Sequence, residues 1–421
     1  MHAGVAHCEA VPLPLIAREV ATPVYVYSTA AMRSNARGLK SALEALDDPL
    51  IAYAVKANPN AAVLATLAGE GLGADIVSGG EYERARAAGI PTDKIVFSGV
   101  GKTAAAMALA LDGGLFQVNL ESLPEAETLS KVAVALGKTA PVAFRVNPDV
   151  EAGSHAKIST GGAQSKFGIS IEDALGAFAR LERLPGLEIR GVAVHVGSQL
   201  TSLKPLEAAF DKLGELIAML RDAGHPMVTA DLGGGLGVAY DPSAEPPPTA
   251  ADYAAMVCRT TRAWDVRLIF EPGRLIAGNA GVLLTEVIRV KDGPSHPFVV
   301  LDAAMNDLLR PTLYDAWHGI EAVIPRGGFM RADVVGPICE TGDSFAQARM
   351  IDRVEAGDLM IVRTVGAYAA AMGSTYNSRP LTPEVLVDGD RWAVVRERQD
   401  VASIIAGEKI PPWLRQEPRK A

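Results

Sequence analysis

The chain is 421 residues long, which exceeds the size of one ordinary hydrophobic core and predicts two domains. Its formal net charge of -9 argues against a nucleic-acid-binding protein, because no basic stripe is present to replace the counterions of a phosphate backbone. No apolar run is long enough to span a bilayer and no signal peptide is apparent, so we expect no membrane partner. Cys8, Cys258 and Cys339 are widely scattered, which argues against disulfides and a metal site and favours a reducing cytoplasm.

The predicted elements divide the chain into three parts. Residues 1–35 include a strand-like stretch at 23–27, which we expect to join the C-terminal domain. Residues 36–280 alternate strand-like and helix-like segments, with strands expected at 51–56, 74–77, 94–97, 115–118, 141–146, 189–195, 227–231 and 266–270. This alternation indicates a parallel sheet, and eight strands favour closure into a (β/α)8 barrel. Residues 281–421 are predicted to form a mostly β domain, so the fold class is α/β.

Unusual polar residues occur on or just after the predicted barrel strands. In such barrels the carboxyl ends of the strands carry the active site, so these side chains are expected to share one face. They are Lys56, Asp75, Ser98, Asn119, Glu121, Arg145, Asn147, His195, Asp231, Gly233 to Gly235, Glu271 and Arg274. The pattern therefore predicts a functional site at the barrel mouth.

Lys56 follows an apolar run of strand character and precedes a turn signal. Burial of its stem would lower the pKa of the amine and make it a nucleophile, able to form a Schiff base with a carbonyl cofactor. The alternative interpretation is a lysine that extends from a strand end into solvent.

The triple glycine Gly233–Gly235 follows the seventh predicted strand. Successive glycines let the backbone approach an anion, and barrels often bind phosphate after the seventh and eighth strands. Arg274, after the eighth strand, is a charge partner for the same anion. A plain turn is the alternative interpretation.

Three further residues suit a pyridine cofactor. Glu271 would favour a protonated ring nitrogen, which makes the ring a better electron sink. His195 would face the ring and Ser198 would donate to the phosphate. A structural salt bridge for Glu271 and a purely structural His195 are the alternatives.

A long connection from Pro148 to about Phe167 follows the fifth predicted strand. Loops of this length in a compact domain are usually functional or mobile, so we expect a lid over the barrel mouth. A passive insertion is the alternative.

Several of these motifs resemble a known family. Tyr53–Asn60, Asp75–Glu81, His195–Gln199, Gly233–Gly235 and Glu271–Arg274 resemble fold-type III pyridoxal-phosphate decarboxylases, whose barrel is of the alanine-racemase type. Further segments narrow the resemblance to the diaminopimelate decarboxylase family, namely Ser165–Gly168, Arg310–Tyr314, Cys339–Asp343, Gly366–Tyr368 and Tyr376–Pro380. The match runs in order along nearly the whole chain.

The resemblance implies a role for each site residue. Lys56 would carry pyridoxal 5'-phosphate as a Schiff base, and Cys339 would donate a proton to the substrate carbon from the second subunit of a head-to-tail homodimer with shared active sites. The implied cofactor-binding residues are Lys56, Asp75, Arg145, His195, Ser198, Gly233, Gly234, Gly235, Glu271, Pro272, Gly273, Arg274 and Tyr368. The implied substrate-binding residues are Arg274, Arg310, Tyr314, Glu340 and Tyr368. One departure is Ala369, where the family commonly has glycine, and it leaves the local backbone geometry open.

The implied activity is that of a carboxy-lyase, which converts meso-2,6-diaminopimelate to L-lysine and carbon dioxide in the last step of lysine biosynthesis. Arg274 and Arg310 offer forked donors for the carboxylate that is kept, and Glu340 offers a charge for the distal ammonium. The sequence leaves open which arginine binds the carboxylate. Glu271 argues against a racemase on the same scaffold, whose ring nitrogen usually faces an arginine. The remaining alternatives are another basic amino-acid or carboxynorspermidine decarboxylase and a non-catalytic, decarboxylase-like regulatory protein.

Overall fold

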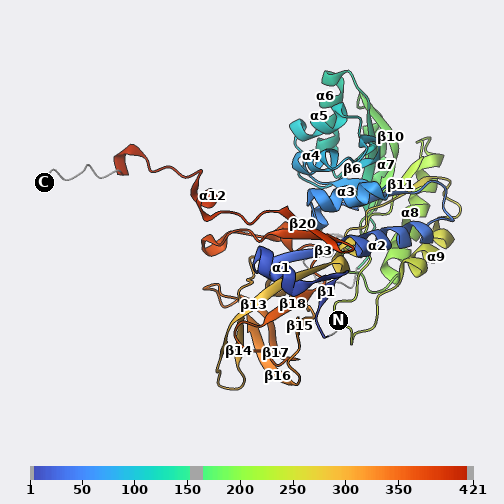
Figure 1. Ribbon diagram of the computed structural model, residues 1–421. Coiled ribbons are helices and arrows are strands. Elements are labelled where there is room, and N and C mark those ends of the chain that lie inside the picture. The colour runs from blue at the N-terminus through green and yellow to red at the C-terminus, as the bar shows by residue number, and fades with distance from the viewer. Residues whose placement is uncertain (1–3, 152–164, 415–421) are drawn as a thin grey trace.

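The computed structural model describes residues 4–151 and 165–414, and a closed barrel of parallel strands forms one part of it (Figure 1). Neighbouring strands pair in the order β4, β5, β6, β7, β8, β10, β11 and β12, and β12 pairs with β4 to close the sheet. This confirms the predicted (β/α)8 barrel. The bounds are β4 Leu50–Ala54, β5 Gly73–Ile76, β6 Ile95–Phe97, β7 Gln117–Leu120, β8 Ala140–Asn147, β10 Leu187–Ala193, β11 Thr229–Asp231 and β12 Arg267–Phe270, while the short β9 Ile169–Ser170 pairs with β8 outside the barrel.

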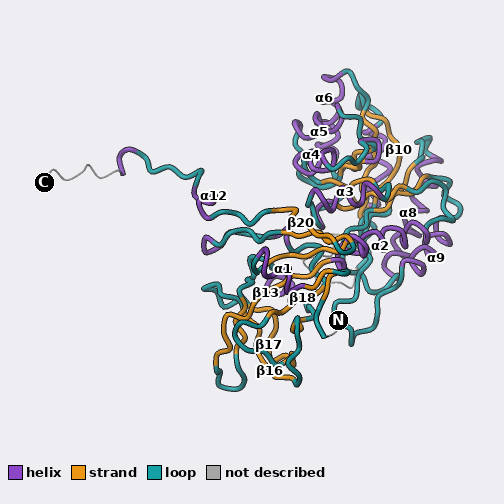
Figure 2. Tube along the Cα trace, viewed as in Figure 1, coloured by secondary structure: helices purple, strands orange, loops and turns teal. Residues whose placement is uncertain are grey.

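Helices α3 to α9 occupy the connections between the barrel strands and α2 precedes the first of these strands, so strand and helix alternate along this part of the chain (Figure 2). Their bounds are α2 Thr29–Ala42, α3 Ala61–Gly69, α4 Gly79–Ala87, α5 Ala104–Asp112, α6 Leu123–Leu136, α7 Ala174–Leu181, α8 Lys204–Asp222 and α9 Ala250–Thr261. Hydroxyl or amide side chains accept hydrogen bonds from the first turn of six of them, at Ser28, Asn60, Ser78, Thr103, Ser122 and Thr249. Such N-caps satisfy backbone donors that the helix itself leaves unpaired.

The second part of the molecule is built around the long strand β13 (Gly281–Lys291). It pairs with β3 (Val24–Ser28), β14 (Phe298–Leu301) and β18 (Leu359–Arg363) along different stretches of its length. The N-terminal strand β3 also pairs with β19 and so lies inside this sheet. The other bounds are β15 Ile320–Ala322, β16 Phe329–Val335, β17 Ser344–Asp352, β19 Glu384–Asp388 and β20 Arg391–Arg396, with α1 Leu13–Val20, α10 Arg274–Ala277, α11 Arg310–Tyr314 and α12 Val401–Ile405 and the hairpin of β1 His7–Cys8 and β2 Val11–Pro12. The domain bounds at 35 and 280 stay a prediction.

The two parts share one hydrophobic core. Tyr53 and Phe270 of the barrel belong to the same buried cluster as Leu283 and Val299 of the β sheet. A smaller cluster, which includes Ile16 of α1, lies on the other side of the β sheet. Because apolar burial drives association, the continuous core fixes the β domain against the barrel. Within the described ranges, no helix combines the length and the apolar character that a membrane crossing requires.

One expectation from the sequence is corrected by the structure, and another falls mostly outside the described residues. The first barrel strand ends at Ala54, and Lys56 lies in the 3-10 turn Val55–Ala57 rather than in the strand. This turn bends the chain at the barrel rim. Most of the expected lid between Pro148 and Phe167 falls outside the described residues, so the lid stays a prediction.

Candidate active site

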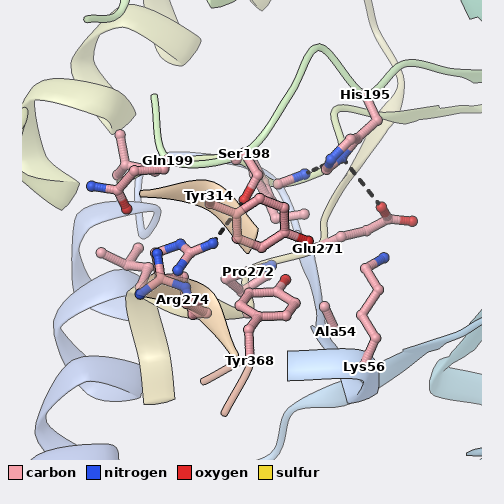
Figure 3. A pocket seen from close by; sticks show the side chains of 18 of the residues that line it. Ala54, Lys56, His195, Ser198, Gln199, Glu271, Pro272, Arg274, Tyr314 and Tyr368 are labelled. Atoms are coloured by element: carbon pink, nitrogen blue, oxygen red, sulfur yellow. Dashed lines mark hydrogen bonds and ion pairs between the residues drawn. The ribbon is translucent and has the colours of Figure 1, made fainter. Parts of the chain in front are cut away.

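A cavity of about 600 Å³ lies where the carboxyl ends of the barrel strands meet the β domain. Lys56 follows β4, Glu271 follows β12 and Tyr368 follows β18 (Figure 3). Arg310, which also lines the cavity, begins α11. Predicted site residues make up half of the lining, namely Lys56, His195, Ser198, Gly233, Gly234, Gly235, Glu271, Pro272, Gly273, Arg274, Arg310, Tyr314 and Tyr368. The fold therefore brings together residues that lie more than 300 positions apart in the sequence.

Four predicted residues do not line this cavity. Asp75 and Arg145 are buried in the barrel, on β5 and β8. Cys339 and Glu340 are exposed on the loop between β16 and β17. Within a single chain, Cys339 and Glu340 therefore lie outside the cavity.

Lys56 is held by a carboxylate. Its Nζ lies 2.8 Å from Oδ2 of Asp75, which is fully buried on β5. Burial lowers the pKa of the Lys56 amine, but the charges of Asp75 and Glu271 outweigh burial and raise this pKa above its ordinary value. The sequence expectation of a lowered amine pKa is therefore wrong for the protein alone, because it counted burial and not the two carboxylates.

Glu271 belongs to a hydrogen-bonded network inside the barrel. Ser98 Oγ donates to Glu271 Oε1 at 3.0 Å, and Asn119 Nδ2 donates to Asp231 Oδ2 at 2.7 Å. Burial and the neighbouring charges of Asp231 and Asp75 raise the pKa of Glu271, and burial also raises the pKa of Asp231. Two buried carboxyl groups that repel one another favour a shared proton. Glu271 is therefore suited to hold a proton at the cavity floor.

His195 is a neutral imidazole. Burial lowers the pKa of His195 well below its ordinary value, and the nearby cations Arg145 and Lys56 add to this effect. The backbone N–H of Gly234 donates to His195 Nδ1 at 3.1 Å, so this nitrogen is an acceptor and the proton resides on Nε2. His195 Nδ1 also lies 4.0 Å from Glu271, but the lowered pKa means that this contact is not an ion pair.

The triple glycine accepts no larger side chain. A Cβ at Gly233 would lie 2.7 Å from His195 Nδ1, and one at Gly234 would overlap the carbonyl oxygen of Glu271. Gly233 and Gly235 also have φ of 65° and 112°, in the region that favours glycine. The backbone therefore forms the cavity wall directly, as a phosphate site requires.

Tyr368 joins the β domain to the lysine turn. Its backbone N–H donates to the carbonyl of Ala57 at 2.8 Å, and its φ of 56° is unusual for a tyrosine. A Cβ at Gly273 would lie 3.1 Å from the Tyr368 hydroxyl, so this side chain lies close over the Gly273 backbone. The next residue, Ala369, has φ of -115°, which a residue with a Cβ adopts. The departure from the family glycine therefore requires no left-handed backbone.

Two buried arginines lie side by side at the β-domain wall of the cavity. Arg274 donates from Nη2 to Ser198 Oγ at 3.2 Å and from Nη1 to the Tyr240 hydroxyl. Arg310 lies over the Tyr240 ring, with its guanidinium carbon 4.3 Å from the ring centroid. Burial lowers the pKa of Arg310 to about 10, and Arg274 adds to the effect. The side chains of Tyr240 and His318 that support this pair had no signal in the sequence pattern.

The cavity suits pyridoxal phosphate in three respects. An amine is present for the aldehyde, a buried carboxyl group for the ring nitrogen, and a glycine-lined wall for the phosphate. Oδ1 of Asp75 and Nε of Arg274 are buried without a hydrogen-bond partner among the described residues. Buried polar atoms are nearly always paired, so such atoms are expected where a polar molecule binds. The residues present therefore fit the cofactor.

Comparisons with known proteins support this fit. The family model described as pyridoxal-dependent decarboxylase, pyridoxal binding domain, matches residues 32–278. A relative from Zymomonas mobilis named diaminopimelate decarboxylase is 53% identical over 408 residues, which cover 96% of this chain and 97% of the relative.

Two solved structures have the same fold over nearly their full length. Diaminopimelate decarboxylase from Helicobacter pylori, complexed with L-lysine, has a TM-score of 0.90 and 37% identity and covers 94% of this chain and 98% of its own. The enzyme from M. jannaschii, also in complex with L-lysine, has a TM-score of 0.94 and 34% identity and covers 98% of each chain. The similarity includes both the barrel and the β domain, and the chain therefore belongs to the diaminopimelate decarboxylase family of pyridoxal-dependent decarboxylases.

Proposed function

We propose that this chain catalyses the pyridoxal-phosphate-dependent decarboxylation of meso-2,6-diaminopimelate to L-lysine and carbon dioxide. One observation carries this choice of substrate. The buried pair Arg274 and Arg310 lies in the same cavity as Lys56 and Glu271. A substrate that keeps one carboxylate after the reaction needs such donors, whereas ornithine or arginine would leave the buried cations unpaired.

The cofactor would be held by Lys56, Asp75, His195, Ser198, the triple glycine, Glu271, Gly273 and Tyr368. When bound, it supplies a sink for the electron pair that carbon dioxide leaves behind. Asp75 orients the Lys56 amine toward the cavity through the 2.8 Å hydrogen bond. Glu271, whose pKa is raised by burial, would hold a proton at the ring nitrogen, and neutral His195 would cover the ring without adding charge.

The reaction also needs a proton donor at the substrate carbon, and we assign this role to Cys339. Cys339 and Glu340 are exposed and lie outside the cavity of their own chain. We therefore propose a head-to-tail homodimer in which each chain supplies Cys339 and Glu340 to the other cavity. Residues 401–414 project away from the body (Figure 1) and expose Trp413 to 83%, which suits burial against a second copy. The unpaired cysteines suit a reducing cytoplasm.

A substrate panel tests the proposed function. The purified holoprotein is offered meso-diaminopimelate, ornithine, arginine and lysine, and carbon dioxide release is measured. We expect kcat/KM for meso-diaminopimelate to exceed that for each of the others by at least about a hundredfold, because only this substrate pairs the buried arginines. Equal or better turnover of ornithine would overturn the substrate assignment.

The alternative of a non-catalytic binding protein has a separate test. A protein of that kind would take up pyridoxal phosphate without turnover, or would bind none and show no visible absorbance. We expect the reconstituted protein to absorb in the visible range and to turn over substrate. Lys56, Glu271 and Cys339 are all present, which favours the enzyme.

A further inference from the structure

The arginine pair at the cavity wall has no carboxylate partner among the described residues. Arg274 and Arg310 are exposed to 6% and 5%, and neither forms an ion pair within the part of the chain that the structure describes. Placing two buried cations together is costly unless their surroundings orient them for an anion. The residues that hold the pair in place therefore matter to substrate binding.

Tyr240 separates and supports the two guanidinium groups. Its hydroxyl accepts from Arg274 Nη1, and its ring lies under Arg310. The imidazole of His318 packs edge-on against the same ring, with centroids 5.0 Å apart and an interplanar angle of 77°. The ring faces attract the cations, while the hydroxyl and imidazole add no positive charge.

His318 fixes the direction of Arg310. The side chain is fully buried, and its Nδ1 donates to the carbonyl of Arg363 on β18 at 2.8 Å. Nε2 of the neutral ring is then an acceptor, and Arg310 Nη1 donates to it at 2.7 Å. Burial lowers the pKa of His318 to about 3, with Arg310 adding to the effect, so the imidazole stays neutral at physiological pH.

This hydrogen bond occupies Nη1 of Arg310 and leaves Nη2 for a ligand. Nη1 is held by His318, whereas Nε is buried without a hydrogen-bond partner among the described residues. Because Nε has almost no accessible surface, a carboxylate in the cavity would bind Nη2, which donates to none of the described residues. On Arg274, by contrast, both terminal nitrogens already donate to Tyr240 and Ser198.

We propose that His318 is a positioning residue for substrate recognition, which presents Nη2 of Arg310 to the carboxylate that the substrate keeps. His318 acts through Arg310 and Tyr240 and does not line the cavity itself. The proposal rests on the proposed function, because it needs a substrate with a second carboxylate.

The experiment compares His318→Gln, His318→Asn and His318→Phe in the holoenzyme. Gln places an acceptor oxygen near the position of Nε2, Asn is too short to reach Arg310, and Phe keeps the ring volume without an acceptor. We expect His318→Phe and His318→Asn to raise KM for meso-diaminopimelate roughly tenfold to a hundredfold, as expected for a lost hydrogen bond to a charged group. His318→Gln should restore KM to within a few-fold of wild type, with kcat little changed in all three.

Two inhibitors separate positioning from a general structural effect. L-lysine carries the carboxylate, and 1,5-diaminopentane is the same molecule without it. In His318→Phe and His318→Asn, inhibition by L-lysine should weaken by the same factor as KM rises, while inhibition by 1,5-diaminopentane and visible cofactor absorbance stay unchanged. His296→Phe, which removes an imidazole paired with Asp333 outside the cavity, is the matched control and should leave KM unchanged.

The inference is wrong if KM is unaffected, if both inhibitors weaken equally, or if Gln behaves like Asn. Should His318→Phe fail to fold, the Gln and Asn pair still decides, because both are polar and of similar size. A wild-type protein that does not turn over meso-diaminopimelate would instead refute the proposed function, so the two failures are distinguishable.

Discussion

At the level of single residues, the site depends on pairs of ionisable side chains that shift one another's pKa. Lys56 lies against Asp75, and Glu271 lies against Asp231, so the preferred protonation state of each group is set by a neighbour from another strand. The two functional histidines are neutral for a common reason. His195 is partly buried and His318 fully buried, both lie near cations, and the pKa of each is lowered.

The lowered histidine pKa predicts how stability depends on pH. The pKa of His318 is about 3 in the folded chain and 6.5 ordinarily, so between these values the unfolded chain binds a proton that the folded chain does not. This contribution to stability is complete above pH 6.5 and is lost as the pH falls toward 3. The free energy of unfolding is measured by chemical denaturation between pH 6.5 and 4. It should fall with pH in both proteins, but the slope for His318→Gln should be smaller than that for wild type by about 1.4 kcal/mol per pH unit. Parallel curves for the two proteins would contradict this assignment.

At the level of elements, function lies in the short connections after the barrel strands. The turn after β4 carries Lys56, and the loop after β11 carries Gly233 to Gly235. The strands are short, and their carboxyl ends converge, so a few residues beyond each strand suffice to build the site.

The glycine loop gives a prediction at this level. Gly234→Ala would place a Cβ against the Glu271 carbonyl oxygen and displace the loop. We expect the dissociation constant of pyridoxal phosphate, measured by absorbance titration, to rise at least about tenfold. Gly176→Ala in α7 is the matched control, because a Cβ there meets nothing within 4 Å. Unchanged cofactor affinity in Gly234→Ala would show that this loop does not contact the cofactor.

The sequence predicts the helices, the strands and the residues at the strand ends well, because these features depend on short stretches of the chain. Alternation of strand and helix patterns and the polar residues at strand ends are local features, so the barrel and most lining residues could be predicted. The raised amine pKa of Lys56 could not, because it arises from Asp75 and Glu271 on distant strands. Tyr240 and His318 were missed for the same reason. Their role comes from contacts with Arg274 and Arg310 that exist only in the folded chain.

At the level of the whole molecule, the β domain completes a barrel site that the barrel alone leaves open. Arg310 and Tyr368 reach the cavity from the β domain, and the shared core holds the two parts together. Cys339 and Glu340 remain outside, so we expect a second copy to supply the missing groups.

Mixing two inactive variants tests this assembly. Lys56→Ala removes the cofactor amine, and Cys339→Ala removes the proton donor. After the mixed subunits are dissociated and reassociated in equal amounts, half of the dimers contain both variants, and each of these has one intact site. Activity should therefore recover to about a quarter of wild type. Each variant treated alone is the control, and no recovery in the mixture would place Cys339 in the cavity of its own chain or outside catalysis.

The most direct test of the central claim is to locate the lysine that carries the cofactor. The holoprotein is treated with borohydride, which makes the bond between lysine and cofactor permanent, and its peptides are analysed by mass spectrometry. We predict the added mass of reduced pyridoxal phosphate on Lys56. Finding that mass on another lysine, with Lys56 unmodified, would contradict the assignment of the active site.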